Sequence, residues 1–136
     1  MSKPASTLAA LLRFMEPMRH DGVYAYCKIP TDAQIAGLLP VVTVREAEGL
    51  TVVVPEEQAI AAGLRVLSRV AWISLTVHSD LEAVGFTAAF ATALAQAGIS
   101  CNVVAGAFHD HIFVPVAQAQ KALDVLRALQ QDALHA

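Results

Sequence analysis

Residues 72–85 read WISLTVHSDLEAVG; an alanine-rich run follows to residue 97, and then GISCN at 98–102. Ile73, Leu75 and Val77 alternate with Trp72, Ser74 and Thr76, and this period of two is typical of a strand with one buried face. The polar segment 78–85 separates this strand from the alanine-rich run. We therefore expect a strand, a tight loop and a helix in direct succession, and we expect function at the loop.

The alanine-rich run predicts a helix from about residue 82 to residue 97, ended by Gly98. Strands are expected next at 100–105 and 112–114, around a turn at 107–110, and a last helix begins at Pro115. The helix at 82–97 is apolar on two stripes. One stripe is Val84, Ala88, Ala91 and Ala95, and the other is Phe86, Phe90, Ala93 and Ala97. Because both stripes need cover, we expect the sheet on one side and a neighbouring helix or a second subunit on the other.

An internal repeat divides the chain. A shift of 60 residues aligns VPEEQA at 54–59 with VPVAQA at 114–119, each at the junction of a hairpin and a helix. Chance is the alternative, because Ala and Val are abundant, but the motif falls at the same structural position in both copies. We therefore expect two tandem units, residues 1–67 and 68–136.

The second unit reads as strand, helix, strand, strand, helix (βαββα). With a right-handed crossover, this order builds an antiparallel-dominated sheet with both helices on one face, the ferredoxin-like arrangement of the α+β class. Neither unit has a closing strand of its own. Each sheet therefore has to borrow an edge from the other half or from another subunit, since exposed edges invite aggregation.

The composition limits the partners. Apolar residues make up 56% of the chain and charged residues 15%, so we expect an apolar surface patch and a homodimer. The net charge of −3 and the absence of a Lys/Arg run argue against nucleic acid. No apolar stretch reaches the ~20 residues of a membrane span, and Cys27 and Cys101 fit two buried thiols in a reduced compartment, so we expect a cytoplasmic protein.

Three segments carry a resemblance to a known family. They are HSDLEAVGFTA at 78–88, AGISCNVV at 97–104 and HDHIFVP at 109–115. Together they resemble the ACT-domain superfamily, in particular small stand-alone bacterial proteins with two ACT-like units, related to the ACT pairs of aspartate kinases and to eukaryotic arginine sensors. The resemblance implies a non-catalytic regulatory or sensor module that binds a small molecule, an amino acid above all. Such a module acts on an enzyme partner and carries no cofactor of its own.

The resemblance also implies a site. In ACT domains the loop between the first strand and the first helix meets the ligand's amino and carboxylate groups through backbone atoms. Here that role falls to Asp80, Leu81, Ala83, Val84, Gly85 and Phe86. Gly85 has no side chain to block a ligand, and the helix start offers free N–H groups to a carboxylate. Asn102 matches the polar side chain that the second strand contributes.

The first half departs from the family. Its connection at 31–40 is too short for the usual first helix. This departure suggests a site between the halves, with Thr31 and Asp32 facing the second half or a dimer mate.

Other readings remain open. Asp80 and Glu82 either cap the helix or bind a ligand's ammonium group; a helix start lowers carboxyl pKa values and suits a catalytic acid/base pair poorly. His109 and His111 with His78 would give a metal-dependent enzyme, although zinc needs three or four ligands and 107–110 reads as a turn. Cys101 with His78 lacks an orienting third group. A structural or protein-interaction module with a vestigial ligand site is the remaining alternative; we expect neither an enzyme nor a metal.

Overall fold

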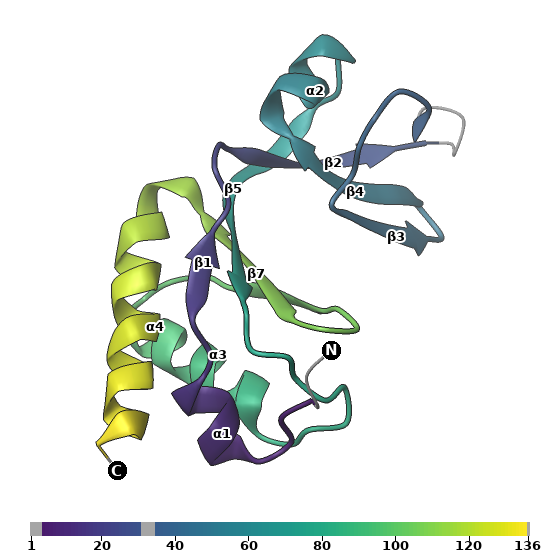
Figure 1. Cartoon of the computed structure of the whole chain (residues 1–136). Coiled ribbons are helices and arrows are strands. Elements are labelled where there is room, and N and C mark those ends of the chain that lie inside the picture. Colours follow the sequence, from purple (N-terminus) through teal and green to yellow (C-terminus); the bar gives the residue numbers. More distant parts are fainter. Residues whose placement is uncertain (1–3, 31–34, 136) are drawn as a thin grey trace. The chain divides into compact units, whose positions relative to one another are not determined.

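A computed structural model describes residues 4–30 and 35–135 (Figure 1). The described residues form two compact units: Asp21–Ala71, the inserted unit, and Met1–His20 together with Trp72–Ala136, the terminal unit. The sequence repeat divides the chain near residue 67, whereas the compact units divide it after residues 20 and 71. The tandem units 1–67 and 68–136 therefore stay a prediction about repeated sequence.

The inserted unit is a four-stranded antiparallel sheet with one helix. It contains β2 (Tyr24–Ile29), β3 (Val42–Glu46), β4 (Gly49–Pro55), α2 (Glu56–Ala61) and the first part of β5 (Val66–Leu75). The strands follow the order β3-β4-β2-β5, in which β2 pairs antiparallel with both β4 and β5. This is the strand order of a ferredoxin-like sheet, and Val66–Val70 of β5 supplies its fourth strand.

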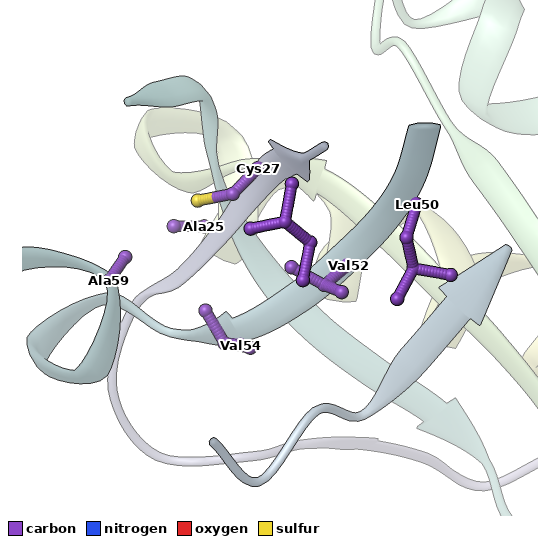
Figure 2. Close-up of a cluster of buried hydrophobic side chains, with 7 residues drawn as sticks. Ala25, Cys27, Leu50, Val52, Val54 and Ala59 are labelled. Carbon is purple, nitrogen blue, oxygen red and sulfur yellow. The ribbon is translucent and has the colours of Figure 1, made fainter. Parts of the chain in front are cut away.

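The core of the inserted unit is built from alternate residues of β2 and β4. Figure 2 shows Ala25, Cys27, Leu50, Val52, Val54 and Ala59 in this cluster, and Ile29 completes it. The β3–β4 turn depends on Gly49, which has φ +148° and where a Cβ atom would lie 2.9 Å from the carbonyl oxygen of Ile29. A glycine is therefore required at this position sterically as well as by backbone angle.

The terminal unit repeats the same strand order with more helices. It contains α1 (Leu8–Arg13), β1 (Pro17–Arg19), the second part of β5, α3 (Phe86–Gln96), β6 (Asn102–Ala105), β7 (Asp110–Pro115), a 3₁₀ turn (Val116–Gln118) and α4 (Ala119–Leu134). The order is β1-β5-β7-β6, with β1 antiparallel to Ile73–Leu75 and β6 antiparallel to β7. Helices α1, α3 and α4 contact one another and cover the sheet (Figure 1).

Both sheets are completed within one chain. β1 comes from the start of the chain and closes the sheet of the second half, while Val66–Val70 closes that of the first half. The prediction that each sheet takes its edge strand from elsewhere is confirmed, and that strand comes from the other half of the same chain. Among the described residues, no helix has the length and apolar character needed to cross a bilayer.

Helix α3 begins at Phe86, four residues later than the pattern predicts. Asp80 forms a turn of its own, because its Oδ1 accepts the N–H of Glu82 and its carbonyl accepts the N–H of Ala83. Gly85 then adopts φ +97° as the residue before the helix. On α3, Phe86, Phe90 and Leu94 are buried, whereas Ala88 and Ala95, on the stripe that begins at Val84, are exposed.

Candidate functional site

The loop between β5 and α3 is held on two sides. On its inner side, Ser79 donates its backbone N–H to the carbonyl of Phe108 in the β6–β7 hairpin (2.9 Å). On its outer side, Asp80 donates to the carbonyl of Ala5 (3.0 Å), and Ala5 donates to the carbonyl of His78 (2.8 Å). The loop is therefore clamped between the hairpin and the residues that precede α1.

A small hollow of about 70 Å³ lies beside this loop. It is lined by Ser79, Asp80, Leu81, Ala83, Phe86, Thr87, Ala105 and Asp110. The lining contains two carboxylates and no cationic side chain, so its electrostatic potential favours a positive group. The first turn of α3 borders the same hollow, and its N–H groups have no partner within the helix.

Asp110 is the most unusual group of the hollow. Only 8% of its surface is exposed, and its side chain is hydrogen-bonded to that of Ser79. Burial raises the pKa of the Asp110 carboxyl above its ordinary value, against the opposing effects of His111 and of the Ser79 hydrogen bond. The carboxylate is under-compensated, because the cost of its burial outweighs both of these effects.

The hollow brings together part of the predicted site. Asp80, Leu81, Ala83 and Phe86 line it. Val84 is 86% exposed and lies outside the lining, and Gly85 is covered by Leu8, whose Cδ2 would be 3.6 Å from a Cβ atom at position 85. These two residues are therefore not placed to touch a molecule in the hollow.

The remaining predicted residues lie elsewhere. Asn102 is exposed on the edge strand β6, three residues along from Ala105, which is ~10 Å in an extended strand. Thr31 and Asp32 lie outside the described residues. The structure does not bring Asn102 to the hollow.

Sequence reasoning missed Ser79, Thr87, Ala105 and Asp110. For Asp110 a signal was present, because in β7 it shares the alternation of Ile112 and Val114, both fully buried. A carboxylate at a buried position of a strand suggests a functional group. The other three residues depend on how the hairpin meets the loop, which no local pattern encodes.

The histidines do not form a metal site. His109 Nδ1 lies 3.1 Å from the carbonyl oxygen of Val77, His78 packs against the ring of Phe108, and His111 is engaged by Trp72 and Ser74. Within the described residues, no three His, Cys, Asp or Glu side chains are placed to share an ion. Burial raises the pKa of the Cys101 thiol to about 11, which keeps it protonated at neutral pH and unsuited to nucleophilic attack.

Larger depressions occur on both units. One of about 280 Å³ surrounds the β3–β4 turn and is lined by Pro30 and residues 45–50, most of which are exposed. Another, of about 460 Å³, lies on the outer side of the 78–82 segment beside Pro4 and Ala107. Neither lining contains a buried carboxylate, so we place the candidate site at the smaller hollow.

Comparison with known proteins gives two matches to family models, both described as ACT domain, over residues 4–71 and 67–128. Together they cover nearly all of the described chain. None of the curated proteins matches the chain.

Solved structures with the same fold include one of high sequence identity to this chain and others of low identity. A protein of unknown function from Vibrio cholerae, described as a possible transport protein, is 46% identical with a TM-score of 0.82, over 90% of this chain and 95% of that one. The regulatory subunit of aspartate kinase from Thermus flavus is 12% identical with a TM-score of 0.63, over 83% and 95%. A protein from Agrobacterium tumefaciens is 20% identical with a TM-score of 0.66, over 84% and 87%. The last two similarities concern the fold alone.

Proposed function

Because the chain belongs to the ACT-domain family, whose members are regulatory ligand-binding modules, we propose that it is a non-catalytic sensor for a small molecule with an ammonium group, an amino acid in the first instance. The observation that carries this proposal is the buried carboxylate of Asp110 in the hollow beside the β5–α3 loop. Asp80, Leu81, Ala83 and Phe86 complete the site that we propose.

The charges of the hollow suggest how such a ligand is oriented. Its ammonium group would lie between Asp110 and Asp80 and supply the counter-charge that Asp110 lacks. Its carboxylate would face the first turn of α3, where free N–H groups and the helix dipole favour an anion. An amino acid carries both groups on one carbon atom, which suits a site with carboxylates and a helix start side by side.

The surface supports a homodimer. Only 15% of the residues are charged, and the exposed Ala88 and Ala95 of α3 leave an apolar stripe uncovered in one chain. ACT domains commonly dimerise, so we propose a cytoplasmic homodimer that regulates an enzyme partner. Light scattering after size-exclusion chromatography measures the mass directly, and a monomer at micromolar concentration would contradict this part of the proposal.

A thermal-shift screen of the twenty amino acids and common primary amines tests the ligand. A compound that binds only the folded state stabilises it by ~2.7 kcal/mol at a hundredfold excess over its dissociation constant. We expect at least one compound to raise the midpoint of the wild type and to lose its effect in Asp110→Asn. Glu82→Gln removes an exposed carboxylate of the same loop that does not line the hollow, and should respond as the wild type does.

The second candidate function is a protein-interaction module whose ligand site is vestigial. The small volume of the hollow favours it, together with the exposed side chains of Leu81 and Val84 beside it. The two functions differ in outcome. A stoichiometric partner from the native host, with no compound shifting the midpoint, supports the interaction module and contradicts the sensor.

A further inference from the structure

The segment 4–8 lies along the outer side of the β5–α3 loop. Ala5 forms a parallel bridge with Ser79 through the two backbone hydrogen bonds to His78 and Asp80. Three residues later, the side chain of Leu8 covers Gly85. The segment thus touches the loop near both of its ends, and Pro4 lines the depression outside it.

The closed loop leaves little room for an amino acid. The hollow of about 70 Å³ is well below the ~300 Å³ at the lower end of sites for drug-sized ligands. Its inner wall is the hairpin residues Ala105 and Asp110, which belong to the paired strands β6 and β7. The loop is the wall with fewer partners, and enlarging the hollow means moving it outward, where segment 4–8 lies.

We propose that residues 4–8 form a strap that holds the loop in its closed form, and that the strap has to release before an ammonium-bearing ligand occupies the hollow. This inference rests on the proposed function and adds a means of regulation to the same site. The strap is held weakly: it has two backbone hydrogen bonds to the loop and a leucine that is 40% exposed. Each such hydrogen bond changes an equilibrium by only about two- to tenfold.

The strap lowers the apparent affinity, because a ligand that binds only the open form binds in proportion to the population of that form. Weakening the strap therefore tightens binding, with no new contact to the ligand. Ala5→Pro removes the N–H that donates to His78, and Leu8→Ala removes the cover over Gly85. Phe14→Ala is the matched control, since Phe14 is an exposed apolar residue at the other end of α1.

Amide exchange measured by NMR without ligand tests the strap itself. Two adjacent amides report separately, because Ser79 donates to the hairpin and Asp80 donates to the strap. We expect the Asp80 amide to exchange about two- to tenfold faster in Ala5→Pro and Leu8→Ala, with Ser79 unchanged and Phe14→Ala like the wild type. Equal rates for Asp80 in all four chains would overturn the strap.

Affinity tests whether the strap acts as a gate, that is, whether it has to release before a ligand binds. The probes are the twenty amino acids, added at increasing concentration in the thermal-shift assay. The expected result is a midpoint response at up to about tenfold lower concentration in the two strap variants than in the wild type and Phe14→Ala. Equal or weaker responses would make residues 4–8 a wall of the site and overturn the gate. If no amino acid shifts any of the four chains, the proposed function fails and the gate fails with it, whatever the exchange rates show.

Discussion

The indole of Trp72 determines the protonation of the histidine beside it. Its Nε1–H can only donate, and it lies 3.1 Å from Nδ1 of His111, so that nitrogen carries no proton. The hydroxyl of Ser74 lies 2.8 Å from the same nitrogen and 2.7 Å from Nε2 of His20. The ring of His20 stacks on Trp72, with centroids 3.4 Å apart. This network needs a neutral His111.

Stability should therefore depend on pH through His111. Burial and the charge of His109 lower its pKa, and Asp110 opposes them. Since the folded state resists protonation more than the unfolded state, we expect the free energy of unfolding to decrease as pH falls below about 6.5. Urea unfolding at several pH values between about 7.5 and 5.5 measures this slope.

The control for this dependence is His111→Gln, whose side-chain oxygen can still accept a hydrogen bond but does not titrate. We expect a shallower slope in that variant over the same pH range. Trp72 is the only tryptophan, so its fluorescence gives a local report of the same event. An identical slope in wild type and variant would show that other groups carry the dependence.

Asp110→Asn should stabilise the chain at neutral pH. The substitution removes the charge of a residue that is only 8% exposed, while its amide can still bond to Ser79. We expect a gain of up to about 1 kcal/mol in the free energy of unfolding. Because the pKa of Asp110 is raised, the gain should shrink as pH falls through that pKa and the wild-type carboxyl becomes neutral. Urea unfolding at neutral and acidic pH checks both, and a loss of stability at neutral pH would contradict the under-compensated charge.

At the scale of elements, the period of the sequence predicted which segments are strands and helices better than where they end. The alternation of residues 72–77 predicted β5, and the two Val-Pro junctions predicted where β4 and β7 lead into helical turns. The start of α3 was wrong by four residues because it depends on Asp80 and Gly85. An aspartate that bonds to the backbone two residues on and a glycine with positive φ interrupt a helix without changing the apolar period.

Gly85 offers a test at this scale. Its φ of +97° lies in the region that costs an L-residue ~1–2 kcal/mol, so Gly85→Ala should destabilise by about that amount, although its Cβ would meet only Leu8 at an ordinary 3.6 Å. Asn tolerates positive φ better than Ala, so Gly85→Asn should cost less. Thermal unfolding of the two variants separates the effects. Equal costs would indicate that contact with Leu8, rather than backbone angle, requires the glycine.

At the scale of the whole molecule, the chain contains two ferredoxin-like sheets, and each is closed by a strand from the other half of the sequence. The two family matches overlap at residues 67–71, and this stretch belongs to β5, which closes one sheet and begins the other. The repeat predicted both units and the missing edges. The repeat could not identify β1 as the closing strand of the second sheet, because a strand of three residues has no period to detect.

The repeat boundary and the compact units make different predictions for the fragment 68–136. It contains β5 from residue 68, α3, β6, β7 and α4, but it lacks β1, which pairs with Ile73–Leu75, and α1, which contacts α3 and α4. Fully buried Leu11 and Met15 leave with them, and each such side chain contributes ~1.5–3 kcal/mol by its burial, a large share of the ~5–15 kcal/mol that holds a domain together.

We therefore expect the fragment 68–136 alone to lack a cooperative unfolding transition and to associate through the unpaired edge of β5. A peptide spanning residues 4–20 supplies the missing strand and helix, so its addition should restore a cooperative transition and a single species. A peptide of the same composition in scrambled order is the control. Circular dichroism melts and size-exclusion chromatography measure both effects. If the fragment folds as a monomer without the peptide, then the sequence repeat, and not the exchanged strand, defines the folding unit.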